Sequence, residues 1–116
     1  MSVIYGNLKT LVNDTLVPRA PLPTAAVSGA SGTVTMLPHV LYVCGTMTSL
    51  TLALAANPTS DFVAEYHIMF DSGSTATTVT YPSGIKFPDG ETPTIEANKT
   101  YEFSIVNNCL TYQWYA

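Results

Sequence analysis

The sequence predicts an all-β protein: an antiparallel β-sandwich or jelly-roll-like domain that follows an extended N-terminal arm. Hydrophobic residues make up 47% of the 116 residues and charged residues only 10%, whereas about a quarter of the residues in a typical globular domain are charged. Eight prolines break up helical patterns. Short stretches in which apolar and polar residues alternate are separated by turn residues at regular spacing, as in antiparallel sandwiches and barrels. The length suits one domain with a real core.

Residues 1–31 are predicted to form the arm, and residues 32–116 the β-domain. Val3–Tyr5 has the pattern of a short strand, and Asn7–Leu16 has partial helical spacing, which predicts either one short helix or an extended segment. The segment Val17–Pro23 contains three prolines. It must be extended, because proline restricts its own backbone and that of the residue before it.

Ordering an arm of this length costs on the order of 30–60 kcal/mol of backbone entropy. At about 25 cal/mol per Å² of buried apolar surface, offsetting that cost needs well over roughly 1,000 Å². A neighbouring subunit supplies such a surface more easily than the arm's own small domain. We therefore expect the arm to be mobile in isolation or ordered on a partner. The predicted assembly interface consists of the arm's apolar residues Ile4, Tyr5, Leu8, Leu11, Val12, Leu16, Val17, Pro18 and Leu22.

The β-domain is predicted from apolar residues that recur at every second position. In Thr48–Ala55 the residues Leu50, Leu52 and Leu54 fall on one face, and Phe62–Phe70 is the longest alternating stretch. Turn residues such as those at 57–61, 71–74 and 88–90 separate the strands. The strands expected before the C-terminal hairpin are Thr33–Leu37, His39–Cys44, Thr48–Ala55, Phe62–Phe70, Thr77–Tyr81 and Ile85–Phe87.

A β-hairpin over Lys99–Trp114 is predicted to carry much of the aromatic core. Tyr101, Phe103 and Ile105 alternate with polar residues, which is the pattern of a strand with one buried face. The dipeptide at 107–108 is Asn-Asn, and asparagine tolerates the positive φ of a tight hairpin loop. Leu110, Tyr112 and Trp114 then give a second apolar row.

Charge and segment composition exclude several classes of protein. The net charge of −4, with only four Lys and Arg residues and no cluster among them, argues against nucleic-acid binding. Met1–Val17 lacks the continuous apolar stretch of a secretory signal, and no apolar run approaches the length of a membrane span. We expect the protein to be made in a cytosol and to be assembled there into something larger.

The two cysteines, Cys44 and Cys109, are expected to be buried thiols, because the chain lacks a secretory signal. The alternative is a disulfide that joins an early strand to the final hairpin. No CxxC or His-rich spacing indicates zinc, and neither a metal nor a cofactor is expected.

Two motifs raise the possibility of catalysis. Phe70–Gly73 resembles the Asp-Ser/Thr-Gly loop of aspartic proteases, in which two carboxylates share a proton across a dimer. The later apolar pair followed by glycine that this family needs is missing, and Asp71 falls late in the chain. Glu65 and His67, two apart on one strand face, could form a general-base or metal pair. The sequence places no nucleophile or third ligand beside them, so a solvated strand face is the preferred interpretation.

Three aromatic residues near the C-terminus, Tyr112, Trp114 and Tyr115, are the candidate contact residues. Their position on the hairpin favours a role for Tyr112 and Trp114 in the core or in a subunit interface. The alternative is a platform on which sugar rings stack.

The second half of the chain carries a recurring order of strands and turns. A Ser/Gly/Thr turn in Phe70–Thr75 precedes a Thr-rich strand that ends in proline, Thr78–Pro82. Ile85–Gly90 supplies a short strand and a glycine, Pro93–Ile95 follows, and a Tyr-Glu-apolar-Ser-Ile strand lies within Asn98–Asn107. This order resembles a β-module of tailed-phage virion structural proteins. Phe87 stands where tryptophan is commoner in that module, and Asn108 where glycine often follows.

The resemblance implies a structural role in a bacteriophage virion. It suggests a capsid decoration or head-fibre protein, with a tail or baseplate attachment module as the close alternative, and such modules are often trimeric. The expected partners are other copies of the chain and the major capsid protein or a tail component. The expected function is therefore non-enzymatic, with docking through the arm. Two further candidates are a carbohydrate-binding (host receptor) module and, remotely, a dimeric aspartic protease.

Overall fold

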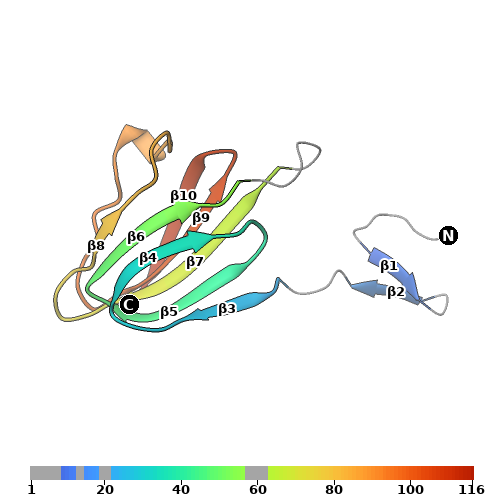
Figure 1. Cartoon of the computed structure of the whole chain (residues 1–116), viewed down its shortest axis with the longest axis horizontal. Helices are drawn as coiled ribbons and strands as arrows, with labels where there is room; N and C mark the ends of the chain where they lie inside the picture. Colours follow the sequence, from blue (N-terminus) through green and yellow to red (C-terminus); the bar gives the residue numbers. More distant parts are fainter. Residues whose placement is uncertain (1–8, 13–14, 19–21, 57–62) are drawn as a thin grey trace.

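The computed structural model describes residues 9–12, 15–18, 22–56 and 63–116, whose elements are almost all β-strands (Figure 1). The predicted all-β class is confirmed. The strands form three sheets. A two-stranded sheet contains β1 (Lys9–Val12) and β2 (Thr15–Pro18). A five-stranded sheet, in the order β10-β9-β7-β5-β3, contains β3 (Thr24–Val27), β5 (Leu41–Met47), β7 (Glu65–Ser72), β9 (Thr100–Val106) and β10 (Cys109–Tyr115). A three-stranded sheet, in the order β4-β6-β8, contains β4 (Ser31–Met36), β6 (Ser49–Leu54) and β8 (Thr78–Thr80).

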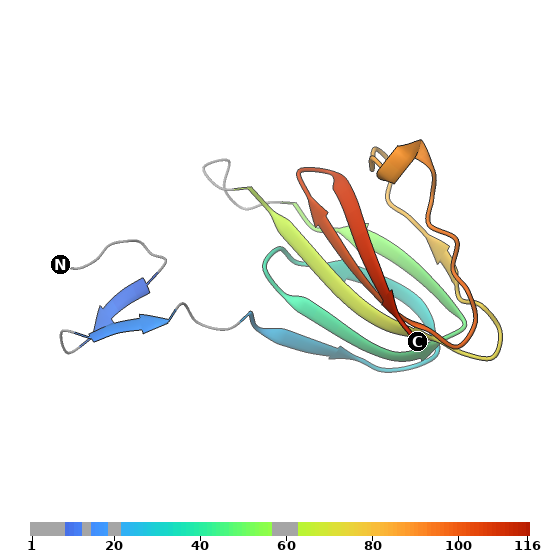
Figure 2. The same cartoon turned by 180° about the vertical axis from the view of Figure 1, so that it is seen from behind.

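From β3 to β8 the chain alternates between the five-stranded and the three-stranded sheet (Figures 1 and 2). Strands β3, β5 and β7 run parallel in one sheet, and β4, β6 and β8 run parallel in the other. Each pass adds one strand to each sheet, and we call β3–β4, β5–β6 and β7–β8 the three windings. The register aligns Thr24 with Leu41 and Leu41 with His67 in the larger sheet.

The antiparallel pairing predicted for these strands is therefore wrong. Alternating apolar residues predict a strand and its buried face, but they do not specify which strand lies beside it. The path from β3 to β5 takes residues 28–40 and includes β4, and it is long enough for the crossover that a parallel pair needs. Strands β5 and β6 are joined by Thr48 alone. One residue is shorter than the loop of a tight hairpin, so the chain passes into the other sheet.

The predicted C-terminal hairpin is confirmed. Strands β9 and β10 pair antiparallel with Val106 opposite Cys109, and the loop residues Asn107 and Asn108 have φ angles of 52° and 63°. Positive φ at both loop residues is the signature of a type I′ turn, whose twist matches that of the flanking strands. Strand β9 also pairs antiparallel with β7. The hairpin therefore completes the five-stranded sheet on the side away from β3.

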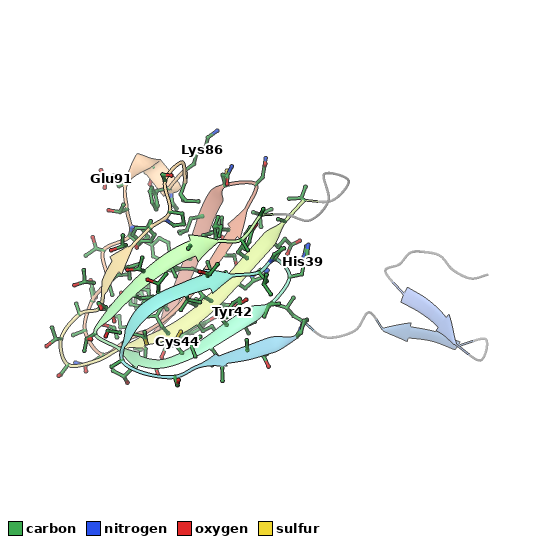
Figure 3. The ribbon with its side chains drawn as sticks, viewed as in Figure 1. His39, Tyr42, Cys44, Lys86 and Glu91 are labelled. Carbon is green, nitrogen blue, oxygen red and sulfur yellow. The ribbon has the colours of Figure 1, made fainter. Side chains whose placement is uncertain are left out.

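One hydrophobic core is shared by the two larger sheets. Phe70 and Phe103 of the five-stranded sheet are fully buried, and Leu50 and Leu52 of the three-stranded sheet are 1% and 2% exposed. The rings of Phe70 and Phe103 pack edge to face with their centroids 5.3 Å apart, a favourable arrangement for aromatic pairs. Tyr42 of β5, labelled in Figure 3, belongs to the same cluster of buried residues.

The N-terminal region differs from its prediction in two respects. The helical alternative for Asn7–Leu16 is wrong, because β1 and β2 pair antiparallel with Leu11 opposite Leu16. Thr24–Val27, placed within the arm by the sequence, forms β3 and pairs with β5. Its Thr-Ala-Ala-Val sequence has too few large apolar residues to predict a strand. The predicted strand at Val3–Tyr5 lies outside the described residues.

The segment between β8 and β9 contains no strand, contrary to the prediction for Ile85–Phe87. Lys86 instead forms a single bridge with Cys109, donating its N–H to Asn108 O (2.8 Å) and accepting from Leu110 N (2.9 Å). The predicted turn at Pro88–Gly90 is a short 3-10 turn in which Asp89 has a φ of 55°. This segment therefore covers part of the outer edge of β10.

A buried hydroxyl in the same region gives a test of the packing. Tyr81 Oη is buried and has no hydrogen-bond partner among the described residues, and burial, followed by the charges of Tyr112 and Tyr101, raises the pKa of Tyr81 to about 12. We expect Tyr81→Phe to raise the free energy of unfolding by about 1 kcal/mol, because it removes a polar group that lost water without gaining a partner. Urea unfolding measures the change.

Tyr42 provides the matched control. Its hydroxyl accepts a hydrogen bond from Leu37 N at 2.8 Å, so Tyr42→Phe is expected to lower the free energy of unfolding by about 1 kcal/mol. Equal destabilisation by Tyr81→Phe and Tyr42→Phe would contradict this account of Tyr81.

Candidate functional site

The outer face of β7, β9 and β10 gathers most of the polar side chains that could act together. Residues directly opposite one another in an antiparallel ladder share a face of the sheet. The ladders β7–β9 and β9–β10 therefore place three rows of residues across this face, all of them polar except Met69. The rows are His67, Ser104 and Thr111; Met69, Glu102 and Gln113; and Asp71, Thr100 and Tyr115.

A hydrogen-bonded chain of three side chains crosses the first row. His67 Nδ1 lies 3.0 Å from Ser104 Oγ, and His67 Nε2 lies 3.2 Å from Glu65 Oε1. In enzymes that use a hydroxyl nucleophile, a neighbouring imidazole acts as the general base and a third group, such as a carboxylate, orients the imidazole. Ser104, His67 and Glu65 occur here in that order. The structure therefore brings the predicted Glu65–His67 pair to a serine that the sequence could not place, because the pairing of β7 with β9 joins residues 37 positions apart.

Within the described part of the structure, these three side chains have no neighbouring backbone N–H group free to serve as an oxyanion donor for acyl transfer. Ser104 lies in the middle of β9, which pairs with β7 on one side and with β10 on the other. The backbone N–H groups around it are used in those ladders, so none is aimed at the place where an oxyanion would form beside Ser104 Oγ. The arrangement orients three polar side chains on the sheet. The preferred interpretation of a solvated strand face suits the Glu65 side chain, which is 51% exposed, better than the His67 side chain, which is 19% exposed.

An open pocket lies beside this chain on the β9–β10 hairpin. Its lining residues are Glu102, Ser104, Thr111, Tyr112 and Gln113. Tyr115 stands next to it, with Oη 3.2 Å from Glu102 Oε1 and 3.0 Å from Gln113 Oε1. The hydrogen bond to the Glu102 carboxylate raises the pKa of Tyr115. Hydroxyl, amide and carboxylate groups with an aromatic ring nearby form a surface suited to a polar, hydroxylated ligand.

Sequence reasoning named Tyr112 among the pocket residues and missed the other four, Glu102, Ser104, Thr111 and Gln113, although one signal contained them. A two-residue Asn-Asn loop fixes the hairpin register, which then places Thr111 opposite Ser104 and Gln113 opposite Glu102, as observed. No comparable local signal predicts that β7 lies beside β9 and adds its side chains to the same face, because the two strands are distant in the chain.

The three candidate aromatic residues lie on two different faces. Tyr112 is half-buried against the core, with its ring centroid 6.0 Å from that of Phe103. Trp114 is 50% exposed, and Lys99 Nζ lies 3.6 Å from the centroid of its ring, a cation–π contact. Successive residues of a strand point to opposite faces, so Tyr115 lies on the pocket face and Trp114 on the other. They do not form one continuous platform.

The aspartate of the predicted protease loop belongs to a strand. Asp71 is in β7, pairs with Thr46 and Thr100 on either side, and accepts a hydrogen bond from Thr100 Oγ1 at 2.7 Å. The predicted turn at Asp71–Ser74 is therefore wrong for its first two residues, because β7 continues through Ser72. The alternation of β7 extends two residues further than the turn propensity of Asp-Ser-Gly indicated.

The predicted interface residues of the arm are only partly described. Leu11 and Val12 are in β1, Leu16, Val17 and Pro18 are in β2, and Leu22 is 42% exposed. Ile4, Tyr5 and Leu8 lie outside the described residues. Their role in assembly stays a prediction.

The cysteines are free and differ in exposure. Cys44 is buried, as predicted, whereas Cys109 is exposed, so its predicted burial is wrong. Cys109 lies opposite Val106 next to the hairpin turn and falls out of phase with the buried Leu110.

We expect a polar thiol reagent to label one thiol per native chain, at Cys109, and the second only after unfolding. Burial, with a smaller contribution from Asp71, raises the pKa of Cys44 from 9.0 to about 11, and the thiolate is the reactive form. Because the folded state binds this proton more tightly, the free energy of unfolding should fall as the pH rises through the range from 9.0 to about 11. Rapid native labelling of both thiols would contradict this assignment.

Among the described residues, no three His, Cys, Asp or Glu side chains gather where they could hold a metal ion. Within the same residues, no helical segment has the length and hydropathy of a transmembrane span.

Compared with family models, with curated proteins and with solved structures, the chain matches none of them.

Proposed function

We propose that this protein is a non-enzymatic structural component of a bacteriophage virion, a capsid decoration or head-fibre protein that docks through its N-terminal arm. Its partners in this proposal are further copies of itself and the major capsid protein or a tail component. The resemblance of the sequence to the phage module implies that three copies of the chain associate, and this number remains a prediction. In this view the two larger sheets act as a β-sandwich, and the residues before β3 act as the docking segment.

The observation that carries the proposal is the distribution of charge. Residues 20–60 contain no Asp, Glu, Lys or Arg. This stretch supplies β3, β4, β5 and β6, and it includes exposed apolar side chains such as Leu37 (57% exposed) and Val43 (42% exposed). Charged residues are depleted in the buried centre of protein–protein interfaces. The surface that this stretch of the chain contributes has no charged side chains, and it is therefore better suited to contact with other subunits than to exposure to solvent.

Removal of residues 1–21 tests the proposal. We expect the shortened chain, which keeps β3, to have the circular dichroism spectrum and unfolding midpoint of the full chain, and to be absent from purified particles. Val106→Ala, an exposed change on β9, is the control and is expected to enter particles normally. Normal incorporation of the shortened chain would show that the arm is not the docking element.

A second candidate function, binding of a carbohydrate receptor, is favoured by the open pocket on β9–β10. We expect Gln113→Ala and Tyr115→Ala to weaken glycan binding at least about tenfold, since each removes a hydrogen-bonding or stacking group at the pocket. Trp114→Ala is the matched control, because that ring lies on the opposite face of β10. The full chain and the three variants are screened on a glycan array. No binding by the full chain, or an equal loss of binding in all three variants, would count against this function.

A further inference from the structure

Both sheets end in an open edge on the side of the first winding. Strand β3 is the last strand of the five-stranded sheet and β4 is the last strand of the three-stranded sheet, and no other strand of the described residues pairs with their outer sides (Figure 1). We propose that two copies of this chain associate about a twofold axis by pairing their β4 strands antiparallel, with Thr33 opposite Thr33 of the partner subunit. This inference concerns the self-association in the proposed function, where it replaces the three copies implied by the sequence resemblance with two, and it is independent of the virion role.

The hydrogen bonds to β6 determine which backbone groups of β4 are free to pair. Ala55 N donates to Met36 O (2.9 Å) and Ser49 N donates to Ala30 O (3.4 Å). Residues of even number therefore direct their N–H and C=O groups to β6, since these groups alternate in direction along a strand. The outward-directed groups of β4 are those of Ser31, Thr33 and Thr35.

The same reasoning applies to the edge of the other sheet. Leu41 N donates to Pro23 O (2.8 Å), so the odd-numbered residues of β3 face β5 and the groups of Thr24 and Ala26 face outward. Within the described part of the chain, the first winding therefore presents two rows of unpaired backbone groups. A partner that adds a strand to such an edge gains main-chain hydrogen bonds along its whole length.

Strand β4 carries none of the features that normally prevent strand addition, whereas β3 is only four residues long and follows Pro23. Natural edge strands are protected by charged residues, proline, bulges or covering segments. Strand β4 has the sequence Ser-Gly-Thr-Val-Thr-Met, and its register with β6 continues from Ser31 to Met36 without a shift. At the other end, β8 is only three residues long, and the bridge at Lys86 covers part of β10. Of the edges of the two larger sheets, that of β4 is the unprotected one.

A second copy is the occupant that this edge fits best. The outward-directed residues 31, 33 and 35 are symmetric about Thr33, so an antiparallel pair of β4 strands centred there gives each of them a partner. The facing side chains are then Thr33 with its own symmetry mate and Ser31 with Thr35, and hydroxyl pairs of this kind stabilise antiparallel ladders. No like charges meet, because residues 20–60 carry none of the acidic residues behind the net charge of −4.

Proline substitution tests the pairing in the full chain. The N–H of Thr33 points away from β6, so Thr33→Pro should keep the fold and lose the dimer, since proline is tolerated on an open edge but cannot donate to a new strand. The N–H of Val34 points to β6, so Val34→Pro is the control that should disrupt the fold. We expect sedimentation to give a dimer for the wild type and half that mass for Thr33→Pro. A wild-type monomer or trimer, or a dimeric Thr33→Pro, would overturn the proposal.

A cysteine cross-link gives a second measurement that does not depend on how proline is tolerated. In a Cys109→Ser background, oxidised Thr33→Cys should form a covalent dimer, because residues directly opposite in a ladder are about 5.5 Å apart at Cα and within disulfide reach. Thr51→Cys is the matched control, since Thr51 lies beside Thr33 one strand further in. Its symmetry mate is about 14 Å away, three strand spacings. Equal cross-linking of both variants, or none at residue 33, would contradict the β4 pairing.

This test separates the inference from the proposed function. A chain that dimerises through β4 but does not enter particles would contradict only the virion role. A chain that enters particles but whose Thr33→Cys variant does not cross-link would contradict only the twofold pairing.

Discussion

Phe103→Ala is expected to lower the free energy of unfolding by about 3–5 kcal/mol. The ring is fully buried on β9 and lies among four other aromatic rings. Their centroids are 5.3 Å (Phe70), 6.0 Å (Tyr81), 6.0 Å (Tyr112) and 6.3 Å (Tyr101) away. These rings come from β7, β9, β10 and the segment after β8, so the neighbours are anchored on several elements and cannot easily close the cavity that alanine leaves.

Urea unfolding of the purified chain measures this loss, with Val106→Ala as the control. Val106 lies on the same strand but is 39% exposed, so its truncation is expected to change the free energy of unfolding by less than about 1 kcal/mol. A change of similar size in both variants would show that Phe103 is not at the centre of the core.

Leu50→Ala is expected to cost about 2–5 kcal/mol, although Leu50 belongs to the smaller sheet. Its side chain is 1% exposed and lies in the core that both sheets share. Because the two sheets are built by the same windings, neither can keep its buried face without the other. We therefore expect a single cooperative transition whose midpoint shifts while its slope stays the same.

Far-UV circular dichroism and tryptophan fluorescence should report the same midpoint for Leu50→Ala. The only tryptophan, Trp114, lies at the end of β10 in the five-stranded sheet, so its fluorescence follows the other sheet. Thr51→Ala, a neighbouring change on the outer side of β6, is the control and should leave the midpoint nearly unchanged. Two separate midpoints for Leu50→Ala would mean that the sheets unfold independently.

The parts of the fold that the sequence predicted correctly depend on local signals. The alternation of Tyr101, Phe103 and Ile105 and the Asn-Asn loop define the C-terminal hairpin within one continuous stretch, and all three of those side chains are buried as predicted. Strands β4 to β8 were likewise located to within a few residues at their ends. What failed was the identity of the neighbouring strands, because parallel pairing depends on contacts between windings that are distant in the chain.

In the candidate site, too, local signals were read correctly and contacts between distant parts of the chain were not. The positions of Glu65 and His67 on one face came from the alternation of β7, whereas the hydrogen bond between His67 and Ser104 required the β7–β9 register. The exposure of Trp114 depended on its place at the end of an edge strand, which hydrophobic periodicity does not encode.

The path of the chain also limits how its length can change. Thr24 and Leu41, neighbours in the larger sheet, are 17 residues apart, and Ser31 and Ser49, neighbours in the smaller one, are 18 residues apart. An insertion of about that size would lengthen both layers by one strand and leave every later side chain facing as before. An insertion of half that size would send each following strand to the wrong layer. The next winding is longer, because Leu41 and His67 are 26 residues apart and Ser49 and Thr78 are 29 apart. Related chains should therefore differ by complete windings, or by loops at the corners, and very rarely by anything between.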